Sequence, residues 1–214
     1  MHAFNYHKAS SVADAAARLA AAPDAKLLAG GQTLIAALKM RLASPTDLVD
    51  LRGIAELRGI RTDGGNIVIG ATATHAEVAE SAAVRKAIPA LARLAGGIGD
   101  RMVRNMGTLG GSVANNDPAA DYPAAVVALG ATVHTSKRRI EADKFFTGMY
   151  ETALEPGEII TSIAFPVPKR AGYMKFGNPA SRYALVGVFV ADSAAGMRVA
   201  VTGAGPSVFR LPEM

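Results

Sequence analysis

The sequence predicts an α+β fold in which two α/β units precede a mostly antiparallel segment. Helical periodicity alternates with short apolar runs up to about residue 156. A hairpin signal, Asp63-Gly64-Gly65-Asn66, separates two alternating runs within that region. Beyond Pro156, three strand-like runs follow one another. We therefore expect three segments, at residues 1–53, 54–156 and 157–214.

The first segment has the pattern of a small βαβ unit. The run SSVADAAARLAAA predicts an alanine-rich helix with a serine cap. The run AKLLAG is typical of a short buried strand, and Gly30 and Gly31 then turn the chain into the helical TLIAALKMRLA. Thr33 can cap that helix, and TDLVDL is the next strand.

The second and third segments differ in their order of elements. In the second, the hairpin ELRGIRTDGGNIVIG is followed by helical patterns in THAEVAES and AAVRKAIPALARLAGGI. The polar stretch RNMGTLGGSVANNDPAADYP comes next, before the helical AAVVALG and the strand ATVHTS. The third segment contains the strands EIITSIAFPVP, YALVGVFVAD and GMRVAVTG, which favour an antiparallel sheet.

Composition limits the possible functions. The 214 residues are 50% hydrophobic, enough to bury a sizeable core. The 23 basic residues exceed the 18 acidic ones by five, but they are dispersed, with KRR at 137–139 the only compact cluster. This surplus suits an anionic ligand or an acidic partner. No basic helix or zinc-finger spacing accompanies it, so we expect no nucleic-acid partner.

The chain contains no cysteine. This excludes disulfides, thiol catalysis and cysteine-ligated iron–sulfur clusters, so any such cluster has to lie on another chain. No stretch reaches the ~18 apolar residues of a membrane span, and the start MHAFNYHKAS does not read as a secretion signal. We therefore expect a cytoplasmic protein. The four histidines, His2, His7, His75 and His134, lack metal-ligand spacing, and we expect them at the surface or at helix caps.

A glycine pair in LLAGGQTL ends an apolar run and starts a helix. The first amides of a helix are unpaired and carry a partial positive charge, so they attract phosphate where the backbone can approach closely. Gly30 and Gly31 permit that approach, and Thr33 adds a hydroxyl. For one isolated pair, a simple tight turn is the better interpretation by about three to one.

A second glycine pair changes that balance. Gly110 and Gly111 lie beside Thr108 and Ser112, in a stretch too polar for a core. Long polar loops of this kind commonly carry function. The carboxylate of Asp121 suits sugar hydroxyls better than phosphate, so a ligand with both a pyrophosphate and a polyol fits, as flavin adenine dinucleotide (FAD) does. The sequence has no P-loop motif, and GGIGDRMVRNMG does not space its glycines as G-x-G-x-x-G.

Through these motifs the sequence resembles the FAD-binding medium subunits of the molybdenum hydroxylases, which include aerobic carbon monoxide dehydrogenase and the flavin domain of xanthine dehydrogenase. The resemblance runs from FNYHKASSVADAAARLA through LLAGGQTLIAALKMRL, IGATATHAEVAES and GTLGGSVANNDPAADYP to EIITSIAFP. It implies two FAD-binding subdomains of the PCMH/vanillyl-alcohol-oxidase type and a C-terminal α+β domain. That domain normally continues well beyond VAVTGAGP, whereas this chain ends at Met214, so the resemblance implies a C-terminally shortened subunit.

The resemblance also implies a set of cofactor-binding residues. Asp121 would bind the polyol chain, Ile160 would supply an apolar contact, and Lys175 would lie near the flavin ring. Gln32 and Ser112 depart from the commoner family residues but keep hydrogen-bonding capacity. The pyrophosphate would lie between two groups of residues, Ala29, Gly30, Gly31, Gln32 and Thr33 on one side and Thr108, Leu109, Gly110, Gly111 and Ser112 on the other.

The function implied is that of an electron-transfer flavoprotein subunit in a heterotrimer. Substrate would be oxidised at molybdopterin on a large subunit, and electrons would pass through iron–sulfur clusters on a small subunit to FAD and an external acceptor. No residue of this chain is assigned as a catalytic acid or base, because the cofactor carries the redox chemistry. Two alternatives are an assembly module that has lost stable FAD and a self-contained flavin oxidase.

Overall fold

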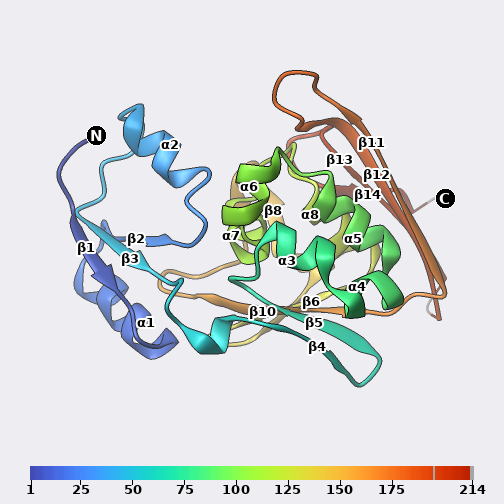
Figure 1. The fold of residues 1–214 in the computed structure, drawn as a ribbon, viewed down its shortest axis with the longest axis horizontal. Helices are drawn as coiled ribbons and strands as arrows, with labels where there is room; N and C mark the ends of the chain where they lie inside the picture. The colour runs from blue at the N-terminus through green and yellow to red at the C-terminus, as the bar shows by residue number, and fades with distance from the viewer. Residues whose placement is uncertain (195, 213–214) are drawn as a thin grey trace.

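The computed structural model describes residues 1–194 and 196–212, and it has the predicted α+β architecture. Figure 1 shows a small N-terminal unit, coloured blue, beside a larger body in which helices lie on one side of a five-stranded sheet. A four-stranded sheet stands at the end of the body farthest from the N-terminal unit. Within the described residues, no helix has both the length and the apolar character needed to cross a membrane.

The N-terminal unit is a three-stranded parallel sheet. Its strands lie in the order β1, β3, β2, with bounds Asn5–Lys8 for β1, Lys26–Leu28 for β2 and Asp47–Asp50 for β3. Helix α2 (Leu34–Lys39) connects β2 to β3, which confirms the predicted βαβ unit. Helix α1 (Val12–Ala21) has the expected serine cap, Ser11. Thr33 is the N-cap residue of α2, as expected, but its side chain makes no capping hydrogen bond.

The second unit is built on a five-stranded antiparallel sheet. The order is β4, β5, β10, β6, β7, with bounds Ile60–Asp63, Asn66–Gly70, Ile160–Pro166, Thr132–Thr135 and Arg139–Glu141. Strands β4 and β5 form the predicted hairpin, where Gly64 and Gly65 have positive φ. The sequence pattern puts β10 in the third segment, but β10 pairs with β5 and β6, which are distant in the chain. We therefore propose a boundary after Pro166 in place of one at residue 157.

Helices α3 to α8 lie on one face of this sheet (Figure 1). Every residue of α8 is buried, because α8 packs between other helices and the strands of the four-stranded sheet. The two sheets of the larger body therefore share one hydrophobic core. The bounds are His75–Glu80 for α3, Ala82–Ala87 for α4, Pro89–Gly96 for α5, Arg101–Met106 for α6, Leu109–Asn115 for α7, Tyr122–Ala128 for α8, Ala142–Phe145 for α9 and Ala55–Leu57 for the 3-10 helix η1.

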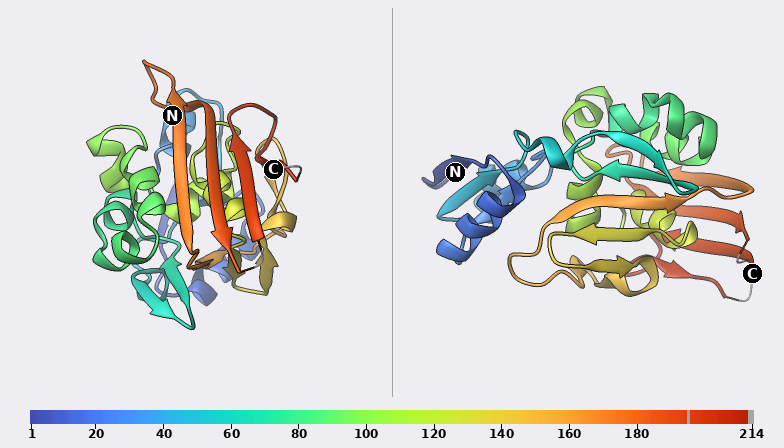
Figure 2. Two further views of the ribbon diagram at one scale, coloured as in Figure 1. Left: turned by 90° about the vertical axis from the view of Figure 1, so that its right-hand side faces the viewer. Right: turned by 90° about the horizontal axis from the view of Figure 1, so that it is seen from below.

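The third segment forms a four-stranded antiparallel sheet. Its strands are β11 (Arg170–Gly177), β12 (Ala184–Ser193), β13 (Gly196–Thr202) and β14 (Phe209–Arg210), paired in that order. Figure 2 shows this sheet from its outer side with the helices behind it. The inner face of β11 carries Tyr173 and Lys175, whereas Met174 and Phe176 point outward and are exposed. Strands β8 (Phe146–Gly148) and β9 (Glu151–Thr152) form a separate pair.

Asn116 fixes the end of α7 against this β8–β9 pair. Its backbone is left-handed, with φ at 43°, and its side chain is fully buried. The amide nitrogen donates hydrogen bonds to the carbonyl oxygens of Gly148, at 2.7 Å, and Glu151, at 2.8 Å. One side chain thus ends the helix and ties it to a pair of strands some thirty residues further along the chain.

We predict that Asn116→Ala lowers the free energy of unfolding by about 3 kcal/mol, from the loss of buried hydrogen bonds and the strain of a left-handed alanine. In a chain of this size the melting temperature should fall by roughly 6–12 °C. Asn116→Gly should recover part of the loss, because glycine accepts the left-handed backbone. The control is Asn5→Ala, at an exposed asparagine with one side-chain hydrogen bond. Equal melting temperatures for Asn116→Ala and the control would contradict the prediction.

Candidate functional site

A cavity of about 690 Å³ is lined by residues of both the N-terminal unit and the larger body. Its volume is in the range of pockets that hold cofactors. Of the predicted site residues, all but Leu109 and Lys175 line this cavity: Ala29, Gly30, Gly31, Gln32, Thr33, Thr108, Gly110, Gly111, Ser112, Asp121 and Ile160. The structure thus brings residues from all three sequence segments to one place.

The first glycine turn (residues 29–33) packs directly against the second glycine turn (residues 106–112). A Cβ atom on Gly30 would lie 2.2 Å from the carbonyl oxygen of Met106, which no side chain can tolerate. Gly111 faces the first turn, with a Cβ position 3.8 Å from the Cβ of Ala29. Gly31 has φ at +72°, which favours glycine for conformational reasons. Part of the glycine requirement is therefore close packing of backbone on backbone, independent of any ligand.

The amides of the first turn are free. Among the described residues, no protein acceptor takes a hydrogen bond from the backbone N–H of Gly30, Gly31 or Gln32. All three residues line the cavity. A run of free N–H groups at the start of a helix attracts an anionic group that comes close to the backbone.

The amides of the second turn are already used. Those of Leu109 and Gly110 donate to the carbonyl oxygens of Ala73, at 3.0 Å, and Ala71, at 2.8 Å. The amide of Gly111 donates to the Thr108 hydroxyl at 3.1 Å. The side chain of Leu109 is buried in the core and does not line the cavity, so the predicted contact of Leu109 with a ligand stays a prediction that only its backbone could fulfil. The second turn brings its backbone close to the cavity but offers few free donors.

Lys175 also lies outside the cavity lining. Its Nζ atom pairs with Asp121 Oδ1 at 2.9 Å and donates to the carbonyl oxygens of Gly97 and Arg182. The hydroxyl of Tyr173 donates to the same Asp121 oxygen at 2.6 Å. Sequence patterns gave no reason to pair Tyr173 with Asp121, because the contact crosses from β11 to the start of α8.

His75 is a cavity residue that the sequence interpretation placed at the surface or at a cap. It does begin α3, directly after the Thr74–Glu77 capping box, but it is only 4% exposed and lines the cavity. Its backbone N–H donates to the carbonyl oxygen of Gly107 at 2.9 Å, which attaches α3 to the second glycine turn. Burial, followed by the charge of Arg104, lowers the pKa of His75 to about 4, so its side chain is neutral at pH 7.

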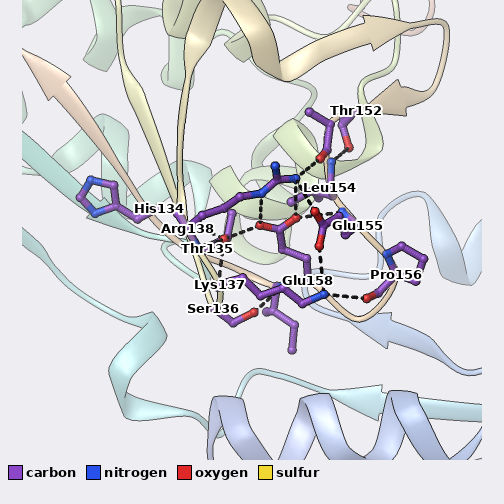
Figure 3. Close-up of polar contacts among 12 residues, drawn as sticks. His134, Thr135, Ser136, Lys137, Arg138, Thr152, Leu154, Glu155, Pro156 and Glu158 are labelled. Atoms are coloured by element: carbon purple, nitrogen blue, oxygen red, sulfur yellow. Dashed lines mark hydrogen bonds and ion pairs between the residues drawn. The ribbon is translucent and has the colours of Figure 1, made fainter.

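A buried carboxylate, that of Glu158, stabilises the apolar end of the cavity. Leu154, Ile159 and Ile160 line this end, and Glu158 lies among them with its side chain fully buried. Figure 3 shows Glu158 between Thr135 and Arg138. Its Oε1 atom accepts hydrogen bonds from the Thr135 hydroxyl at 2.6 Å and from Arg138 Nε at 3.1 Å. The loop between β6 and β7 thus sets the position of the cavity wall.

Glu158 should make the free energy of unfolding depend on pH in the acidic range. Burial raises the pKa of Glu158, but the hydrogen bonds from Arg138 and Thr135 outweigh that rise and lower the pKa to about 2. A carboxylate with a pKa below its unfolded value of about 4.3 stabilises the fold at higher pH, and the effect is lost as pH falls through that range toward 2.

We predict that Glu158→Gln lowers the free energy of unfolding at pH 7 by about 2 kcal/mol, and that the difference from the unmodified protein closes as pH falls from about 4.3 to 2. Urea denaturation at a series of pH values measures both effects. The matched control is Glu155→Gln, in the same cluster but 53% exposed, where an ion pair contributes at most about 1 kcal/mol. A loss that is the same at pH 7 and at pH 2.5 would refute the pH dependence.

The donor set fits a long ligand with an anionic centre. The first glycine turn supplies free amides, and Asp121 supplies a carboxylate that can accept hydrogen bonds from hydroxyl groups. Ile159 and Ile160 form an apolar wall. Phosphates, a polyol and a flat ring system would each find complementary chemistry in that cavity.

Comparisons with known proteins agree with this geometry. Residues 2–168 match the family described as "FAD binding domain in molybdopterin dehydrogenase". The carbon monoxide dehydrogenase medium chain of Afipia carboxidovorans is 43% identical over 77% of this chain and 59% of its own length. The nicotine 6-hydroxylase medium subunit of Paenarthrobacter nicotinovorans is 36% identical over 99% of this chain and 78% of its own.

A solved structure matches the whole arrangement. The carbon monoxide dehydrogenase structure from Hydrogenophaga pseudoflava superimposes with a TM-score of 0.93 at 37% identity, covering 98% of this chain and 77% of that one. The fold predicted from the resemblance is confirmed by this match. The chain therefore belongs to the family of FAD-binding domains found in molybdopterin dehydrogenases.

Proposed function

We propose that this chain is the FAD-binding electron-transfer subunit of a heterotrimeric molybdenum hydroxylase. The observation that carries the proposal is the cavity in which the free amides of the first glycine turn and the Asp121 carboxylate lie together. Bound FAD supplies the redox chemistry, accepting electrons and passing them on. The polypeptide binds, orients and shields it.

Each group of residues has a distinct role in this proposal. The amides of Gly30, Gly31 and Gln32 hold the pyrophosphate, and the second glycine turn closes on it from the other side. Asp121 accepts hydrogen bonds from the polyol, and Ile160 packs on the apolar part of the cofactor. Lys175 acts on the site through Asp121, since its own N–H groups are all engaged by the protein.

The partners follow from what this chain lacks. It contains no cysteine, so cysteine-ligated clusters that deliver electrons to FAD belong on another subunit. Two relatives are named as a medium chain and a medium subunit, which supports an assembly with a smaller and a larger subunit. We assign the iron–sulfur clusters to the small subunit, and molybdopterin and substrate to the large one. An external acceptor then takes the electrons from FAD. A cytoplasmic assembly is consistent with a chain that forms no disulfides.

We predict that Gly31→Asp lowers FAD affinity at least tenfold, because a carboxylate enters the turn whose amides face the pyrophosphate. The measurement is flavin absorbance between 300 and 600 nm after incubation with FAD and desalting, followed by a titration of affinity. The matched control is Gly64→Asp, the same change at another glycine with positive φ, in the exposed β4–β5 hairpin where a Cβ meets no neighbour. Equal flavin retention in the two variants would contradict the role of the first turn.

The same preparation separates the proposed function from its alternatives. Failure of the unmodified chain to bind FAD would favour the assembly module. Turnover of a substrate by the isolated flavoprotein would favour a self-contained oxidase. Reduction of the bound flavin only when reduced iron–sulfur subunit is added is the result that we expect.

A further inference from the structure

Asp121 is held by two donors from the same strand. It is the N-cap residue of α8, is 4% exposed and lines the cavity. Tyr173 and Lys175 are two residues apart on β11, so both side chains project from the inner face of the sheet. The Tyr173 hydroxyl lies 2.6 Å from Asp121 Oδ1, and Lys175 Nζ lies 2.9 Å from the same atom.

The second carboxylate oxygen of Asp121, Oδ2, has a different environment from Oδ1. No hydrogen bond reaches Asp121 Oδ2 from another residue that the structure describes. Nor is Oδ2 among the buried polar atoms without a partner. Oδ1 is thus engaged by two side chains of β11, and the backbone N–H of Asp121 itself also reaches the carboxylate. Because Asp121 lines the cavity, Oδ2 is the oxygen that remains available to a ligand there.

Lys175 has no donor left for a ligand. Its ammonium group has three N–H bonds, and the structure gives it three partners: Asp121 Oδ1, the carbonyl oxygen of Gly97 and that of Arg182. Tyr173 likewise uses its only O–H bond on Asp121. Neither side chain lines the cavity, so both affect a ligand through Asp121.

We propose that Tyr173 is a positioning residue of the cofactor site: together with Lys175 it fixes Asp121 Oδ1, so that Oδ2 is oriented toward the hydroxyl groups of the cofactor's polyol. This inference rests on the proposed function and deepens it. Tyr173 is required for the direction and the ionisation of the acceptor and makes no contact with the ligand itself.

Packing of β11 does not require the hydroxyl. The Tyr173 ring packs against Phe189, with centroids 6.0 Å apart. Phenylalanine keeps that contact and removes only the donor to Asp121. The substitution Tyr173→Phe therefore tests the hydrogen bond with little disturbance of the core.

The local electrostatics add a second readout. Burial raises the pKa of Asp121, and the hydrogen bonds from Tyr173 and then Lys175 counteract that rise. Burial and then the charge of Asp121 raise the pKa of Tyr122 on α8, and burial followed by Asp117, Tyr150 and Asp121 raises the pKa of Tyr183 on the loop after β11. Both phenols are therefore uncharged between pH 5 and 8. Loss of the Tyr173 donor should move protonation of Asp121 to higher pH, and a protonated Asp121 is a poorer acceptor.

The experiment is a titration of the full chain with FAD at pH values from 5 to 8, for the unmodified protein, Tyr173→Phe and Tyr122→Phe. Tyr122 is the matched control because it adjoins Asp121 and is fully buried, yet its hydroxyl has no partner among the described residues. We expect Tyr173→Phe to weaken FAD binding about tenfold at pH 7, the effect of one hydrogen bond to a charged group. The weakening should increase as pH falls, and Tyr122→Phe should follow the unmodified protein.

The outcomes separate this inference from the function on which it rests. If the unmodified chain binds FAD and Tyr173→Phe has the same affinity at every pH, the positioning role is wrong while the FAD-binding function stands. A uniform loss in Tyr173→Phe that Tyr122→Phe shares reflects general destabilisation and also overturns the role. If the unmodified chain binds no FAD, both the proposed function and this inference fail.

Discussion

The close approach of two backbone turns is the constraint on which the site depends. Gly30 lies against the carbonyl group of Met106, and Gly111 faces Ala29, so the N-terminal unit and the larger body meet through atoms of the main chain. Side chains at these positions would push the two units apart and widen the cavity between them. The rest of the site, from the Asp121 carboxylate to the apolar wall, is useful to a single ligand only at the spacing that this contact sets.

The two glycine pairs look alike in the sequence and differ in their chemistry. The first leaves its amides free, whereas in the second Gly110 donates to the carbonyl oxygen of Ala71 and Gly111 donates to the Thr108 hydroxyl. Gly110 is needed because its Cβ would lie 2.6 Å from that of Ala71. One pair is thus suited to binding and the other to bringing a helix and a strand end close together. A motif in sequence does not distinguish these uses, since both call for the absence of a side chain.

Local signals in the sequence predicted local features well. The βαβ unit, the Gly64-Gly65 hairpin, the serine cap of α1 and the two glycine turns follow from patterns within a few residues. What escaped prediction depends on long-range contacts: the central place of β10, the burial of His75 under the second turn, and the hydrogen bond from Tyr173 to Asp121. Each of these pairs residues that no periodicity connects. The resemblance to a family supplied Asp121 and Lys175, but not the fact that they pair with each other.

The neutral imidazole of His75 has a consequence for a protein that carries electrons. Because its pKa is about 4, this side chain stays almost entirely neutral when the pH of the surroundings changes between 5 and 8. A histidine of ordinary pKa at the same place would add a full positive charge beside the cavity over that range, and would pull the midpoint potential of any redox group there upward with acidity. Burial under the Gly107 backbone removes this source of variation. Acidification within this range therefore adds almost no charge at this position beside the cavity.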